Sequence, residues 1–135
     1  CEGCTGLEEL LLANNEIEAI PDEIAALAAL TTLGLAANRL RALPDALGGC
    51  GALRVLRLGE NQLRALPAAI GTCGRLQELS APDNLLTTLP PTLCDCPLQV
   101  VNLARNRLSS LPAELGKLAS LRTLVLKGNR LEERP

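Results

Sequence analysis

The sequence predicts a repetitive α/β solenoid in which short parallel strands alternate with short helical or 3-10 segments. Three observations predict this fold class. A pattern LxxLxLxx recurs along the 135 residues, an asparagine follows each copy, and a proline stands six positions after each asparagine. The asparagines lie 23, 23, 23, 22 and 23 residues apart, so one unit fills the chain. They are Asn15, Asn38, Asn61, Asn84, Asn106 and Asn129.

The leucines of the segment LxLxx stand just before the asparagine of each unit. They alternate with other residues, which is the period of a strand with one buried face. So short a strand hides that face only when copies stack into a parallel sheet, with strands roughly 4.8 Å apart. The asparagine amide then offers donors and an acceptor to the backbone of the following turn. Stacked copies therefore predict a ladder of asparagine hydrogen bonds along one edge.

The proline and the apolar pair after it complete the unit. Proline fixes φ near −65° as the chain leaves the turn. Two apolar residues at three-residue spacing follow, as in Ile24 and Leu27, and fit a short helical or 3-10 segment that covers the core from outside. The expected result is a curved solenoid with its strands on the concave side.

The unit LxxLxLxxNxLxxLPxxIxxLxx resembles a leucine-rich repeat. More narrowly it is similar to the class with Leu-Pro after the asparagine, which includes intracellular Ras-group-related, Ras-suppressor and Ras-scaffold proteins and Roco GTPases. The resemblance covers the whole chain and implies a right-handed curved horseshoe. It implies a single domain, residues 1–135, in which residues 1–6 end a preceding repeat. Repeats begin at positions 7, 30, 53, 76, 98 and 121, the last of them incomplete, so we expect a fragment of a longer array.

Composition excludes several kinds of chemistry. The chain has no His, Phe, Trp, Tyr or Met, and its formal net charge is −2. It therefore lacks imidazole catalysis, histidine zinc ligands and aromatic platforms for single-stranded nucleic acid. No glycine-rich phosphate loop is present, and the longest apolar run, residues 24–30, is too short to span a membrane. We expect no enzyme, cofactor, metal or nucleic-acid partner.

The cysteines follow the repeat phase. Four of them share the second apolar position of the outer segment, which Leu27 and Leu118 fill elsewhere, and Cys1 shares the position of Ile24. This phase predicts small buried hydrophobes, and a core of reduced thiols indicates an intracellular, cytoplasmic protein. Cys94 is out of phase, and we expect it on the outer surface as a redox-active or an incidental thiol. The four in phase are Cys4, Cys50, Cys73 and Cys96.

The residues between and beside the strand leucines are expected to point to the concave face. The resemblance implies that they bind a protein partner, with Arg57 the best single anchor because arginine is enriched at hot spots. The candidates are Glu9, Leu11, Thr32, Val55, Arg57, Glu78, Ser80, Asn102, Val125 and Lys127, and the remaining positions are Ala13, Gly34, Ala36, Gly59, Pro82, Val100, Ala104 and Thr123. The alternative is that this stretch is only a scaffold whose binding surface lies in other repeats.

Charge is segregated along the chain. Residues 1–23 carry seven acidic side chains and no basic one. Six arginines near the asparagine turns predict a basic ridge along one edge, which is either a docking strip for an acidic partner or ordinary solvated loop charge. They are Arg39, Arg41, Arg64, Arg105, Arg107 and Arg130.

Repeat four is irregular. Ala81 takes a strand leucine position, Pro82 follows it, and one residue is missing between Cys96 and Leu98. Pro82 is expected to remove a donor from the ladder of the sheet. These departures indicate either a kink or softer joint, or sequence drift that the fold tolerates.

Two functions remain open. The first is a non-catalytic scaffold for protein–protein interaction, for which the family resemblance suggests a small GTPase or a kinase as partner. The second is a recognition or regulatory segment of a larger enzyme, such as a Roco GTPase, a receptor-like kinase or a ubiquitin ligase. An idealised artificial array is a third possibility, against which the irregular fourth repeat argues.

Overall fold

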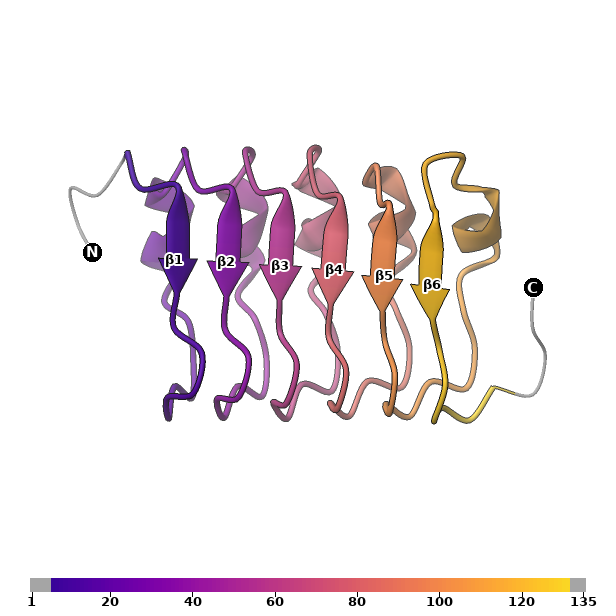
Figure 1. The fold of residues 1–135 in the computed structure, drawn as a ribbon. Helices are drawn as coiled ribbons and strands as arrows, with labels where there is room; N and C mark the ends of the chain where they lie inside the picture. Colours follow the sequence, from indigo (N-terminus) through magenta and orange to yellow (C-terminus); the bar gives the residue numbers. More distant parts are fainter. Residues whose placement is uncertain (1–5, 132–135) are drawn as a thin grey trace.

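The computed structural model describes residues 6–131, and in this range six strands form one parallel sheet in the order β1-β2-β3-β4-β5-β6. Figure 1 shows the strands side by side, all pointing the same way, with the helical segments behind one face. The strands are β1 (Glu9–Leu11), β2 (Thr32–Gly34), β3 (Val55–Arg57), β4 (Glu78–Ser80), β5 (Val100–Asn102) and β6 (Thr123–Val125). The helical segments are η1 (Asp22–Ala26), η2 (Asp45–Gly49), η3 (Ala68–Thr72), η4 (Pro91–Asp95) and η5 (Ala113–Lys117). This architecture confirms the predicted solenoid.

All five helical segments are 3-10 helices that start directly after a proline. The prolines have φ between −58° and −75° and extended ψ. Each proline carbonyl accepts a hydrogen bond from the amide three residues on, for example that of Ile24 from Pro21 at 3.1 Å. The fixed φ of proline therefore starts each outer segment, as the sequence predicts.

The core lies between the sheet and the 3-10 segments. It contains the central residue of each inner strand, such as Leu56 and Leu79, and the two apolar residues of the outer segments, except that Leu118 is only partly buried. Glycine permits close packing of that outer layer. A Cβ added at Gly71 would lie 2.6 Å from the carbonyl oxygen of Thr92 in the next segment, whereas one added at Gly74 would meet nothing within 4 Å.

The asparagine ladder runs along the edge at which the strands end. Asn61 shows the arrangement of the inner repeats: Nδ2 donates to the carbonyls of Leu35, Leu58 and Gly59 at 2.9–3.2 Å. Its Oδ1 accepts from the amide of Leu40 at 3.0 Å. The side chain thus ties its own turn to the turn of the preceding repeat. Asn38, Asn84 and Asn106 are buried and bonded in the same way.

Pro82 does not break the sheet, so the predicted loss of a ladder donor is wrong. Pro82 lies two residues beyond the end of β4. At the same repeat position the amides of Ala36, Gly59 and Ala104 donate to no backbone group within residues 6–131, so proline removes no ladder bond there. Its carbonyl still accepts from the amide of Glu60 at 2.9 Å.

The residue that repeat four lacks between Cys96 and Leu98 is accommodated by a different backbone conformation in the turn after η4. Cys96 has ψ 147°, whereas the equivalent Leu27, Cys50 and Cys73 have ψ between 67° and 75°. The amide of Leu98 bonds to the carbonyl of Cys96, two residues back, instead of three residues back as in the earlier repeats. The register of β4 with β5 is continuous, so the missing residue does not interrupt the sheet.

We expect amide hydrogen exchange to decide whether this turn is a soft joint. Because the sheet bonds continue across it, the protected amides of β3, β4 and β5 should exchange within about one order of magnitude of one another. Exchange measured by mass spectrometry or NMR on the native chain checks this expectation. Amides of β5 that exchange several orders of magnitude faster than those of β3 would instead establish a separate opening unit.

Candidate functional site

The exposed face of the sheet is opposite the 3-10 segments, and no helix covers it in the described part of the chain (Figure 1). The strand register aligns its side chains in columns. One column runs from Glu9 through Thr32 and Val55 to the later strands, and the next begins at Leu11. We call these two columns the sheet face. They comprise Glu9, Thr32, Val55, Glu78, Val100, Thr123, Leu11, Gly34, Arg57, Ser80, Asn102 and Val125.

The ten candidate binding residues, nine on the sheet face and Lys127 two residues beyond β6, differ in exposure. Glu9, Leu11, Arg57 and Lys127 are exposed, and the other six are half-buried by their neighbours. Leu11 is 61% exposed, and it is the only exposed large hydrophobic residue among residues 6–131.

Some small positions do not offer the surface that the sequence predicts. Gly34 stands in one of the two columns, and Gly59 and Ala104 lie two residues beyond β3 and β5, but all three are buried, which corrects the expectation that they offer surface to a partner. The reason is the bulk of the neighbouring repeat: a Cβ at Gly34 would lie 3.0 Å from the Leu11 side chain. A Cβ at Gly59 would lie 3.2 Å from the ring of Pro82.

Arg57 is paired on the sheet face. Its Nε donates to Oε2 of Glu78 on the neighbouring strand at 3.3 Å. The arginine side chain remains 55% exposed, so the pair adds little stability, typically about 0–1 kcal/mol. A partner that uses Arg57 as an anchor would therefore compete with Glu78 for it.

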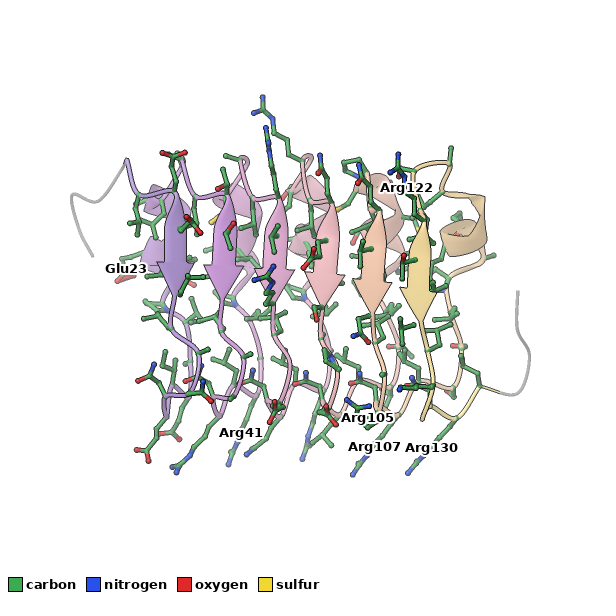
Figure 2. The ribbon with its side chains drawn as sticks, viewed as in Figure 1. Glu23, Arg41, Arg105, Arg107, Arg122 and Arg130 are labelled. Carbon is green, nitrogen blue, oxygen red and sulfur yellow. The ribbon has the colours of Figure 1, made fainter. Side chains whose placement is uncertain are left out.

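The basic ridge lies along the asparagine edge, and all six of its arginines are exposed. Figure 2 shows Arg41, Arg107 and Arg130 pointing away from the turns on this edge, opposite the edge with Arg122. Two members are neutralised by the repeat before them. Arg39 bonds to Glu16 at 3.3 Å, and Arg105 bonds to both carboxylate oxygens of Asp83 at 2.7 and 2.8 Å. The Arg105 hydrogen bonds lower the pKa of Asp83.

Sequence reasoning missed a hollow on the same edge. Arg41, Gln62, Arg64 and Leu85 line it, with a volume of about 360 Å³. Gln62 and Leu85 follow their asparagines directly, as Arg39, Arg107 and Arg130 do. The position directly after the repeat asparagine is therefore the sequence signal that could have predicted Gln62 and Leu85 on this edge.

The cysteine side chains of the described residues lie on the side of the sheet that the 3-10 segments cover, away from the sheet face. Cys50, Cys73 and Cys96 are buried, as the repeat phase predicts. Each contacts the carbonyl of the residue 26 positions earlier, for example Cys96 Sγ with Ile70 at 3.3 Å. Cys94 is half-buried and packs against the core, which corrects its expected exposure. Cys1 and Cys4 lie outside the described residues.

Burial raises the pKa of Cys73 and of Cys96 to about 11, from 9.0 for a free thiol. It also raises the pKa of Cys94, with help from Glu114 and Asp95. These thiols stay protonated at neutral pH, which removes the nucleophilic form. Within residues 6–131 no group of three or more Cys, Asp or Glu side chains is arranged to hold a metal ion, and no helix is long and apolar enough to cross a membrane.

We expect the raised thiol pKa values to make stability fall in mild alkali. Between pH 9 and 11 the unfolded chain ionises its thiols while folded Cys73 and Cys96 hold their protons. The stabilisation is complete below pH 9 and is lost as pH rises through the folded pKa, by about 1–2 kcal/mol per thiol. Urea unfolding from pH 8 to 11 measures it. The C73A/C96A variant should show a shallower fall, and an equal slope would contradict the assignment.

The architecture defines a class of protein: an open solenoid of parallel strands that presents one uncovered sheet face. Residues 74–131 match the family described as Leucine rich repeat, and the chain has the leucine-rich repeat fold. No curated protein sequence matches the chain significantly.

Solved structures carry the same fold. A leucine-rich repeat protein of Leptospira interrogans is 29% identical with TM-score 0.69, over 96% of this chain and 45% of that one. A chain of the Drosophila Toll–Spatzle complex is 29% identical with TM-score 0.69, over 95% and 21%. A chain of the PEPR1–AtPEP1 structure is 29% identical with TM-score 0.80, over 96% and 19%. This chain thus spans less than half of each, and proteins with this fold generally mediate protein–protein interaction.

Proposed function

We propose that the chain is a non-catalytic module that binds a protein partner on its sheet face. The uncovered, in-register columns of side chains over six strands carry this proposal. Parallel sheets are usually covered on both faces, so an open face is available for a partner. The Toll–Spatzle complex and the PEPR1–AtPEP1 structure each contain a chain with this fold, which supports a binding role.

The partner class and the location belong to the same proposal. The Leu-Pro repeat unit resembles the intracellular Ras-related class, and this favours a small GTPase or a kinase as partner. The buried free thiols of Cys50, Cys73 and Cys96 favour a reducing, cytoplasmic compartment.

A pair of charge-matched variants tests the sheet face. Thr32→Arg with Ser80→Arg places two bulky cations on it, at half-buried side chains of β2 and β4. Gly51→Arg with Gly74→Arg, the outer variant, places the same charges in exposed turns between a 3-10 segment and the next strand, where an added Cβ meets nothing within 4 Å. Candidate partners are purified small GTPases in both nucleotide states and purified kinases, or a protein first isolated by affinity capture.

Binding is then measured by biolayer interferometry. The face variant should weaken partner binding by about tenfold or more, because buried charge and steric bulk are costly at an interface centre. The outer variant should change it less than about twofold. Equal loss in the two variants, or unchanged binding by the face variant, would refute the sheet face as the binding surface.

A second candidate is a recognition segment of a larger enzyme. It is favoured by one observation: each of the three solved structures extends well beyond the region that resembles this chain. A nucleotide-binding loop or a catalytic domain in the sequence flanking this chain would support a Roco GTPase, a receptor-like kinase or a ubiquitin ligase. Flanking sequence made only of further repeats would support the stand-alone scaffold.

A further inference from the structure

The basic ridge contains arginines in two different states. Arg39 and Arg105 are held by Glu16 and Asp83 of the preceding repeats. Arg41 and Arg64 stand at one repeat position in neighbouring repeats, and neither makes an ion pair within residues 6–131. Both residues are exposed. Two adjacent cations without a carboxylate partner repel each other, so an added anion gains from both.

The backbone around these two arginines is fixed by the asparagine ladder. The amide of Leu40, just before Arg41, donates to Asn61 Oδ1 at 3.0 Å. The amide of Leu63, just before Arg64, donates to Asn84 Oδ1 at 3.0 Å. The hollow therefore sits on a rigid turn, which lowers the entropy cost of binding at its backbone.

The other two side chains that line the hollow are an amide and an aliphatic group. Gln62 is exposed and carries an amide that can donate and accept, and Leu85 is half-buried and apolar. An anion with an adjoining apolar group would satisfy all four side chains. A bare anion would leave Leu85 unused.

We propose that the Arg41–Arg64 hollow docks a short acidic segment of a protein partner, with a carboxylate on the arginines and an apolar side chain on Leu85. This inference rests on the proposed protein-binding function and extends that function from the sheet face to its edge. The segment is short because the two cations are alone at their repeat position: Glu18 occupies it in the preceding repeat, and Thr87 and Ser109 occupy it in the next two repeats. A row of only two cations, with Glu18 before it, offers little attraction to a long polyanion such as RNA, and no aromatic side chain is present to stack on bases.

The probe is a short fluorescein-labelled peptide of alternating glutamate and leucine, with a second peptide in which serine replaces each leucine. Fluorescence anisotropy with the full chain at low and at physiological salt measures binding. The R41E/R64E variant should weaken binding of the leucine peptide by about fivefold or more and flatten its salt dependence. The control is R54E/R75E, which makes the same charge change at exposed arginines on the opposite edge of the strands and should alter binding by less than about twofold.

Leu85 and the sheet face provide two further readouts. Leu85→Ser should remove the preference for the leucine peptide over the serine peptide, as expected if Leu85 contacts the apolar group. The Thr32→Arg/Ser80→Arg variant should keep its affinity for the peptide, so a failed sheet face and a failed hollow give different results.

Three results would overturn the proposal. The first is the absence of saturable peptide binding, and the second is equal weakening of that binding by R41E/R64E and R54E/R75E. The third is binding of single-stranded RNA or of phosphatidylserine vesicles that is tighter than binding of the leucine peptide and depends on Arg41 and Arg64.

Discussion

Replacing Asn61 with alanine is expected to lower the free energy of unfolding by about 3–5 kcal/mol. The side chain is buried and makes four hydrogen bonds to the backbone of two successive turns. Alanine leaves the amide of Leu40 unpaired in a buried turn, which costs about 1–3 kcal/mol. It also removes three donated bonds worth about 0.5–1.5 kcal/mol each, although the carbonyl of Leu35 keeps its bond from Asn38. Urea unfolding followed by circular dichroism measures the change.

Asn15 supplies the matched control. It occupies the same repeat position but is exposed, and within residues 6–131 its amide bonds only to the carbonyls of Leu12 and Ala13. Water can replace those bonds, so Asn15→Ala should cost about 1 kcal/mol or less. If the two variants lost the same stability, the effect would belong to the local turn and not to the connection between repeats.

Much of this fold could be predicted because a single repeat unit encodes it. The period of the leucines places the strands, each proline starts a 3-10 segment, and the asparagines lie where the turns need an amide. The phase argument works for buried cysteines for the same reason, since Cys73 simply replaces a leucine in the stack. It fails for Cys94, because the outer segment shields a position that the pattern alone places outside.

The candidate site was harder to predict because it depends on neighbours in three dimensions. Pairing of Arg105 with Asp83 requires the two turns to be adjacent, and this pairing divides the basic ridge into paired and unpaired arginines. Pro82 illustrates the same limit. The pattern assigns it to a strand, but the equivalent amides of Ala36, Gly59 and Ala104 donate to no backbone group in the described part of the chain, so proline costs no ladder bond there. Asn84 still donates to the carbonyl of Pro82.

Replacing Leu58 with alanine should cost about 3–5 kcal/mol, which is near the upper end for a buried leucine. Leu58 is fully buried, and the same position in the next repeat is already the small residue Ala81, also fully buried. A packed neighbour can relax into a cavity only if it has side-chain atoms to move, and Ala81 has none beyond Cβ. The loss of free energy should therefore exceed that of Leu35→Ala, whose following neighbour is Leu58 itself, by about 1 kcal/mol.

Two comparisons separate cavity formation from other causes in this measurement. Leu11→Ala removes the same atoms from a side chain that is 61% exposed, so it should change stability by less than about 0.5 kcal/mol. The second comparison uses the double variant Leu35→Ala/Leu58→Ala, whose cavities adjoin and whose costs should not add. If Leu58→Ala cost no more than Leu35→Ala, then the residues around Ala81 have already closed in, and the irregular fourth repeat is packed as tightly as its neighbours.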